Sequence, residues 1–120
     1  MERVGIPTFE ARVSPVLDVC NRMLLVDIDN ACEVHRHEIS LEKVDFIERI
    51  EFLNRWGIHK IICSGVSDLM CKYLSAKNII LISGVVGEFE NVITAYICGK
   101  LDDTCFSMPG KGHSDTGKFI

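Results

Sequence analysis

The sequence has no excess of positive charge, no long apolar run and no closely spaced cysteine pair. Its 120 residues carry 13 Lys and Arg against 17 Asp and Glu, a formal net charge of −4. This balance argues against a nucleic-acid or anionic-membrane partner, which normally requires a basic surface. No apolar run approaches the roughly 20 residues that span a bilayer, and the N-terminus lacks the layout of a signal peptide. We therefore expect a cytoplasmic protein that binds neither nucleic acid nor membrane.

Cysteine is the unusual component of the composition. Six cysteines are present, and none forms a CxxC pair of the kind that structural zinc sites use. Disulfide frameworks belong to small secreted chains with little core, whereas 48% of these residues are hydrophobic. We expect most of the thiols to be reduced and buried as small hydrophobic groups.

The chain has no internal repeat and no low-complexity stretch, and its length fits one domain. We predict a single α/β domain over residues 1–104. Residues 105–120 contain few apolar anchors, so we expect them to form a mobile C-terminal tail.

Hydrophobic periodicity predicts five strands and three helices. The first strand is expected to stop at Pro7, and Ser40 and Ser67 are expected to cap the first two helices. In order, the expected elements are a strand at 3–7, a loop at 8–21, a hairpin of strands at 22–28 and 32–39, a helix from Ser40 to Gly57, a strand at 60–63, a helix after Ser67, a strand at 79–82 and a helix from Phe89 to Gly99.

The order of these elements predicts the fold class. Continuous apolar strands that alternate with helices are typical of parallel strands covered on both faces. Right-handed crossovers then place the fourth and fifth strands parallel to the first. We predict a mixed five-stranded sheet of order 3-2-1-4-5 flanked by helices.

This topology predicts a binding site at the carboxyl ends of the parallel strands. The loops at 8–15, 64–67 and 83–87 should meet there. Two of them contain glycine and lead into helix N-termini, which favour an anion, and Arg12 adds a positive charge. The glycines could equally serve only to make tight turns.

Catalytic motifs are weak. The first strand has no acid in its middle, and nothing pairs Cys20 or Cys63 with a particular histidine, so we expect no enzyme. His35 and His37 share one face of a strand and could chelate a metal, although exposed histidines beside a turn are the simpler interpretation. The segment Gly112–Lys118 fits GxxxxGK, but Phe119 follows it in place of Ser or Thr, which excludes a phosphate-binding loop.

Several segments together resemble a known family. These are Gly5–Thr8, Arg12–Pro15 leading to Leu24–Asp27, Ile61–Ser67, the Ser83–Val85 turn, and Ala95–Tyr96 through Gly99–Leu101. Over residues 3–109 the chain resembles the dinitrogenase iron–molybdenum cofactor-binding family. The resemblance implies a ribonuclease-H-like α/β layer without a nuclease site. It also implies a non-catalytic carrier that binds an iron–molybdenum or other anionic metal–sulfur cluster and exchanges it with a cofactor-assembly or acceptor protein.

The resemblance extends to candidate site residues. Many relatives have a His-Phe-Gly triplet where this chain has Val16-Leu17-Asp18, so that imidazole is absent, and Cys20 and Cys63 become the candidate metal ligands. The candidate cluster-binding residues are Arg12, Ser14, Cys20, Cys63, Ser64, Gly65, Gly84 and Gly87. The alternative is a protein-interaction or regulatory module that binds no cluster. A third hypothesis is an enzyme that acts on small phosphorylated molecules through the same loops.

Overall fold

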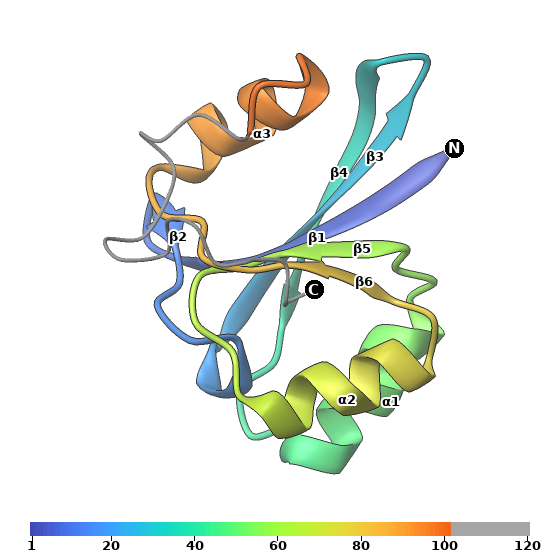
Figure 1. Cartoon of the computed structure of the whole chain (residues 1–120), viewed down its shortest axis with the longest axis vertical. Helices are drawn as coiled ribbons and strands as arrows, with labels where there is room; N and C mark the ends of the chain where they lie inside the picture. Colours follow the sequence, from blue (N-terminus) through green and yellow to red (C-terminus); the bar gives the residue numbers. More distant parts are fainter. Residues whose placement is uncertain (102–120) are drawn as a thin grey trace.

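The computed structural model describes residues 1–101, which form a mixed sheet with helices on both faces (Figure 1). The predicted tail at 105–120, Cys105 and the segment 112–118 lie outside the described residues. The elements in order are β1 (Glu2–Phe9), β2 (Arg12–Val13), the short 3-10 helix η1 (Leu17–Val19), β3 (Arg22–Asp29), β4 (Cys32–Ser40), α1 (Phe46–Arg55), β5 (Lys60–Ile62), α2 (Asp68–Ala76), β6 (Ile80–Ile82) and α3 (Phe89–Ile97).

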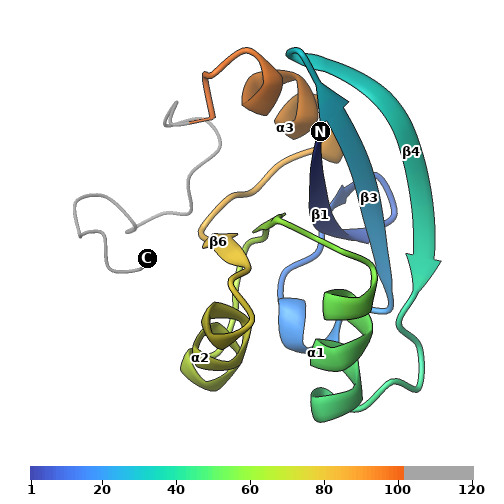
Figure 2. The same ribbon diagram turned by 90° about the vertical axis from the view of Figure 1, so that its right-hand side faces the viewer.

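The sheet has six strands in the described part of the chain. Five of them lie in the order β4-β3-β1-β5-β6, and β2 pairs with β1 outside this path. Strands β1, β5 and β6 are parallel, whereas β3 is antiparallel to both β1 and β4. Strands β4 and β6 therefore form the two edges of the sheet, as Figure 2 shows.

Each face of the sheet carries its own apolar core. Helices α1 and α2 cover one face and α3 covers the other (Figure 1). Under α1 and α2, the fully buried residues include Leu25, Leu53 and Met70. Under α3, they include Ile6, Val26 and Val92. Because both faces of the central strands are buried, their sequences are continuously apolar, which is the pattern that predicted the α/β class.

The first strand is longer than predicted. Strand β1 continues through Pro7 to Phe9 and turns back into β2, which the sequence interpretation missed. The carbonyl of Pro7 accepts a hydrogen bond from the Ser14 N–H, on the side away from β3. Strand β5 pairs only with Val4 and Gly5, so no β5 partner needs a donor from Pro7. A proline is tolerated where the ladder needs no N–H group.

Helix α1 begins later than predicted. Ser40 belongs to β4, and Asp45 is the residue that caps α1, since its side chain accepts a hydrogen bond from the Glu48 N–H at 2.9 Å. Lys43 has a positive φ of 65°, which is incompatible with a helix at that point. The other two expected features are present: Ser67 caps α2, and Gly57 follows α1 with a φ of 71°.

Among residues 1–101, no helix combines the length and the apolar character that crossing a bilayer would require.

Candidate functional site

The three predicted loops do meet at the carboxyl ends of β1, β5 and β6, but they bind one another. Gly65 N–H donates to Pro15 O at 2.7 Å, and Gly84 N–H donates to Ser64 O at 2.8 Å. Gly87 contributes its carbonyl, which accepts from Val13 N–H at 2.9 Å. A Cβ atom at Gly65 would lie 2.7 Å from the Pro15 oxygen, so this glycine permits close backbone approach. The N–H groups of Gly65 and Gly84 are thus already bonded within the protein.

A carboxylate of the chain itself occupies the N-terminus of α2. Asp18 accepts hydrogen bonds from Ser67 N–H at 2.9 Å and from Ser67 Oγ at 2.6 Å. The Ser67 hydroxyl oxygen in turn accepts from Met70 N–H. A negative group at this position satisfies free N–H groups and the helix dipole. Asp18 therefore occupies one of the two helix N-termini at which an external anion was predicted.

Both candidate cysteine ligands are buried. Cys63 is fully buried, and desolvation, with smaller contributions from Cys71 and Cys20, raises the pKa of its thiol to about 12. Burial also raises the pKa of Cys20, although the Arg49 guanidinium acts in the opposite direction. Metal binding requires the thiolate form, so these environments oppose ligation by either sulfur.

The remaining predicted site residues divide between surface and interior. Arg12 is exposed on β2, whereas Ser14 and Ser64 are buried. Ser14 and Cys20 line one small pocket with Thr8. Buried Arg49 donates to the Cys20 carbonyl at 2.7 Å and forms no ion pair with a carboxylate of residues 1–101. Among residues 1–101, the predicted residues are thus divided between the surface, a small pocket and the interior.

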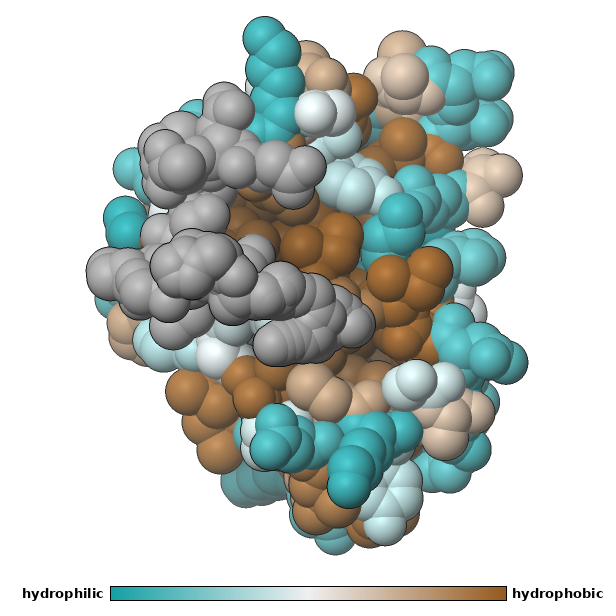
Figure 3. Space-filling model, viewed as in Figure 1, coloured by the Kyte–Doolittle hydropathy of each residue, from teal (hydrophilic) through white to brown (hydrophobic). Residues whose placement is uncertain are grey.

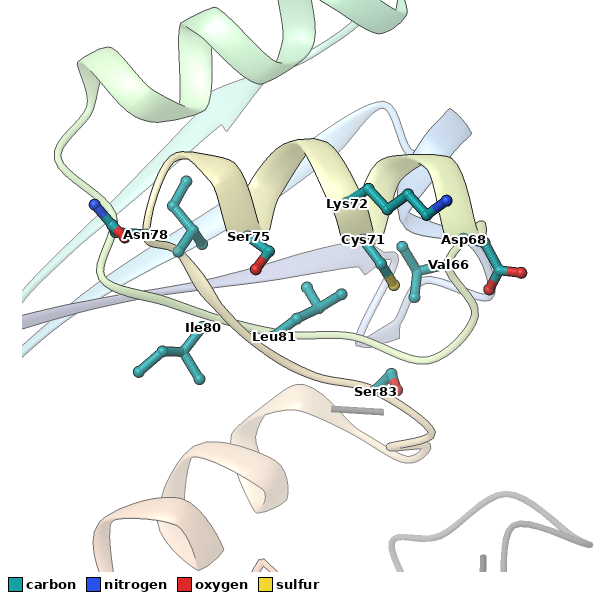
Figure 4. Close-up of a pocket in the computed structure, with 10 residues that line it drawn as sticks. Val66, Asp68, Cys71, Lys72, Ser75, Asn78, Ile80, Leu81 and Ser83 are labelled. Atoms are coloured by element: carbon teal, nitrogen blue, oxygen red, sulfur yellow. The ribbon is translucent and has the colours of Figure 1, made fainter. Parts of the chain in front are cut away.

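A more apolar groove lies between α2 and the edge strand β6 (Figure 4). Cys71 and Ser75 point from α2 toward Leu81 of β6, and Asp68 and Lys72 stand at one end of the groove. Hydrophobic surface extends over this region of the molecule in Figure 3, and the nearby Ile80 is 58% exposed. The groove offers shape and apolar surface, and it has no cluster of metal-ligating groups among the described residues.

A cluster of metal-ligating groups lies elsewhere, at the amino ends of β1 and β5. Asp27 of β3 and His35 and His37 of β4 have ligand atoms within 4.8 Å of one another. The two imidazole rings stack with centroids 4.3 Å apart, and His37 Nε2 is 3.8 Å from Asp27 Oδ2. Asp27 is buried, His37 is half-buried and His35 is exposed. The group is therefore anchored in the sheet and open to solvent on one side.

A β-bulge brings these three residues to one face. The turn residues Asn30 and Ala31 both have positive φ, as expected for a two-residue type I′ hairpin. Ile28 pairs with Glu33, but Asp27 pairs with His35, so Val34 is the extra residue. Opposite residues of an antiparallel pair share a face. Without the bulge, Val34 would stand opposite Asp27 and both histidines would face the other side.

Arg3 holds the Asp27 carboxylate in place. Its Nε donates to Asp27 Oδ1 at 2.7 Å and its Nη2 donates to Oδ2 at 3.1 Å, a two-point contact. Its Nη1 donates to the carbonyl of Trp56, directly after α1, at 2.7 Å. The Arg3 backbone N–H donates to His59 Nδ1, just before β5. One side chain thus connects β1, β3 and the end of α1.

The electrostatics of the cluster follow from this ion pair. The hydrogen bond from Arg3 lowers the pKa of Asp27 despite burial, and the nearby imidazoles of His37 and His35 act in the same direction. The carboxylate is therefore ionised, and Arg3 neutralises its charge. The site consists of two imidazoles beside an ion pair of zero net charge. His59 lies next to this ion pair, where its Nδ1 accepts a hydrogen bond from the Arg3 backbone N–H.

Two imidazoles and a carboxylate form a donor set that suits Zn²⁺ and other divalent transition metals. Ligand atoms on one tetrahedral Zn²⁺ lie about 3.5 Å apart at bond lengths of about 2.0–2.2 Å. The observed spread of up to 4.8 Å thus requires a closure of about 1 Å, within reach of side-chain rotation. His35 Nδ1 accepts a hydrogen bond from Arg36 N–H at 3.0 Å. A metal at Nδ1 would take the accepting lone pair, and a metal at Nε2 would leave the ring proton on Nδ1, so binding at either nitrogen would break this hydrogen bond.

The sequence pointed to the two histidines, but not to Asp27 and Arg3 as their neighbours. The HxH spacing on a strand is a usable signal for a shared face. No signal in the sequence fixes the bulge, and only the bulge brings Asp27 opposite His35.

Comparisons with known proteins support the fold alone. The sequence matches no family model and no curated protein. Its structure is similar to that of PH0822, with a TM-score of 0.80, 20% identity, and coverage of 91% of this chain and 96% of that one. It is also similar to a protein named "putative dinitrogenase" (MJ0327) from Methanocaldococcus jannaschii, with a TM-score of 0.69, 20% identity, and coverage of 82% and 89%. A third similar structure is named "putative NifB protein" (TM1290), from Thermotoga and the DUF35 family, with a TM-score of 0.66, 18% identity, and coverage of 83% and 90%.

The Arg3–Asp27 pair predicts a defined stability phenotype. Arg3→Gln leaves a buried carboxylate without its cation and should lower the free energy of unfolding by about 3 kcal/mol. The double variant Arg3→Gln with Asp27→Asn should recover part of this loss, because no charge is then buried alone. Chemical denaturation of the wild type, Arg3→Gln, Asp27→Asn and the double variant measures the coupling, and strictly additive losses would contradict it.

The same pair predicts how the free energy of unfolding falls at acidic pH. The folded-state pKa of Asp27 is lowered, so its contribution is present above the unfolded-state value of about 3.9 and is lost as the pH falls through the folded pKa. Asp27→Asn should therefore lose less stability than the wild type on acidification below about pH 4.

Proposed function

We propose that this protein is a non-catalytic metal-binding carrier, whose cargo is an anionic metal–sulfur cluster of the kind used in nitrogenase cofactor assembly. The single observation that carries this proposal is the convergence of Asp27, His35 and His37 at one open end of the sheet. The names of two similar structures, "putative dinitrogenase" and "putative NifB protein", support the nitrogenase connection. In this proposal the ribonuclease-H-like layer of the resembled family is a scaffold for binding.

The proposal assigns cargo binding to the imidazoles in preference to the cysteines. A neutral imidazole can bind a metal without first losing a proton, whereas a thiol must first become a thiolate. Burial raises the pKa of both Cys20 and Cys63, which disfavours the thiolate form. Cys63 is fully buried in the core under α1 and α2, so ligation there would also require the core to open. His35 needs no such rearrangement because it is exposed.

The exposure of the site suits a carrier. A resident cofactor is normally enclosed, but a cargo must pass to another protein. His35 and His37 lie on the edge strand β4, where an assembly or acceptor protein can approach without displacing a helix. An imidazole would replace one exchangeable ligand of the cluster, and the partner would reverse this exchange.

The test compares two double variants with the wild type under anaerobic conditions. Zn²⁺ is titrated by calorimetry, and an anionic iron–sulfur cluster with exchangeable thiolate ligands is followed by visible absorbance that elutes with the protein. His35→Gln with His37→Gln should weaken Zn²⁺ binding by more than the roughly 10–100-fold that loss of a supporting residue costs, and should abolish cluster retention. Cys20→Ser with Cys63→Ser should leave both nearly unchanged.

The sole tryptophan and a third histidine supply internal controls. Trp56 lies 6.0 Å from the His37 ring, so Ni²⁺ or Cu²⁺ bound at the cluster should quench its fluorescence. His59→Gln removes a neighbouring imidazole that lies outside the triad and should have little effect. Loss of cargo in the cysteine variant but not in the histidine variant would contradict the assignment.

The groove beside β6 favours a second candidate function, a protein-interaction module. Ile80 N–H and Ile82 O bond toward β5, so alternation points the N–H and C=O groups of Leu81 outward. An extended apolar segment of a partner protein could pair with this edge and pack its side chains into the groove.

A displayed library of random peptides tests this second function. Selected binders should share an apolar extended motif, and Ile80→Lys should abolish their binding. Val34→Lys is the matched control, since Val34 is 52% exposed on the opposite edge strand. Binders that are insensitive to Ile80→Lys, or the absence of any binder, would count against a docking role for the groove.

A further inference from the structure

The candidate metal site already contains a fixed cation. Arg3 binds both oxygens of Asp27 at 2.7 and 3.1 Å, and the Asp27 side chain is only 6% exposed. Salt screens a buried pair of this kind much less than an exposed one. Any charge that arrives at His35 and His37 therefore interacts with the guanidinium as well as with the carboxylate.

We propose that Arg3 determines the charge class of the cargo, so that the site favours an anionic metal–sulfur cluster over a free hydrated divalent cation. This inference rests on the proposed function, because it concerns the same site. With Arg3 present, the carboxylate is neutralised and the site gains little from attracting a bare dication. An anionic cluster, by contrast, meets imidazole ligands without facing an uncompensated negative charge.

The other ion pairs made by the strands at this end of the sheet involve α3, so they lie on the face opposite to His35 and His37. The acidic residues Glu33 and Glu90 are bound to Arg36, through contacts of 2.6 Å to each. Glu2 is bound to Lys60 and Tyr96. These acids therefore have cationic partners of their own. Arg3 is the cation in direct contact with Asp27 among residues 1–101, and its other contacts, to Trp56 and His59, carry no negative charge.

Substitutions of Arg3 and of Asp27 should shift the affinity for Zn²⁺ and the affinity for the cluster in opposite directions. Arg3→Gln makes the site more negative, so it should tighten Zn²⁺ binding and weaken binding of the anionic iron–sulfur cluster, each by about tenfold or more. Asp27→Asn leaves Arg3 without a counter-charge, so it should weaken Zn²⁺ binding and preserve or tighten cluster binding. Arg3→Lys keeps the charge and should retain the wild-type ratio of the two affinities.

The experiment measures the ratio of cluster affinity to Zn²⁺ affinity in the full-length wild type and these three variants, with circular dichroism as the folding check. A ratio that falls in Arg3→Gln, rises in Asp27→Asn and is retained in Arg3→Lys supports the inference. If Arg3→Gln does not fold, the double variant Arg3→Gln with Asp27→Asn is compared with Asp27→Asn alone, which isolates the guanidinium charge: the ratio should fall when Arg3 is removed, and an unchanged ratio overturns the inference.

Two negative results are distinguishable. A wild type that retains neither Zn²⁺ nor the cluster contradicts the proposed function itself. A wild type that binds cargo, with variants that shift both affinities in the same direction or leave the ratio unchanged, overturns the role of Arg3 while the binding function stands.

Discussion

The ion pair between Arg3 and Asp27 is the interaction on which the arrangement of the candidate site depends. Arg3 lies at the start of the central strand β1, and its guanidinium joins Asp27 of β3 to the carbonyl of Trp56 after α1. Its backbone N–H binds His59, just before β5. These contacts hold β1, β3, the start of β5 and the end of α1 in place around one buried carboxylate. The two histidines of β4 then complete the cluster from the adjacent strand.

The two ends of the sheet differ in what they offer a ligand. At the carboxyl ends of the parallel strands, Gly65 and Gly84 bind neighbouring loops, and Asp18 accepts hydrogen bonds from Ser67, the N-cap residue of α2. At the amino ends, Asp27, His35 and His37 present ligand atoms beside a solvent-exposed edge. The usual rule places ligands at the carboxyl ends of such strands. In the proposed account this chain closes that end with its own hydrogen bonds and uses the other one.

The sequence predicted the mixed α/β class because buried strands and amphipathic helices have distinct hydrophobic periods. It misplaced the start of α1, since Ser40 and Asp45 both suit a cap and only the positive φ at Lys43 decides between them. It missed β2 because proline ordinarily ends a strand. It recognised that His35 and His37 share a face, but it gave no signal for the bulge at Val34, so the meeting with Asp27 was not predictable. Burial of Cys20 and Cys63 agrees with the expectation that thiols pack as small hydrophobic groups, whereas Cys32 and Cys98 are exposed, and the spacing of the cysteines does not distinguish the two cases.

X-ray absorption spectroscopy of the wild-type protein loaded with one equivalent of Zn²⁺ tests the central claim most directly, because it identifies the ligand atoms. The account predicts a first shell of nitrogen and oxygen at about 2.0–2.2 Å, with the outer-shell scattering of two imidazole rings. A sulfur shell at about 2.3 Å would show that cysteine holds the metal and would contradict the assignment to Asp27, His35 and His37.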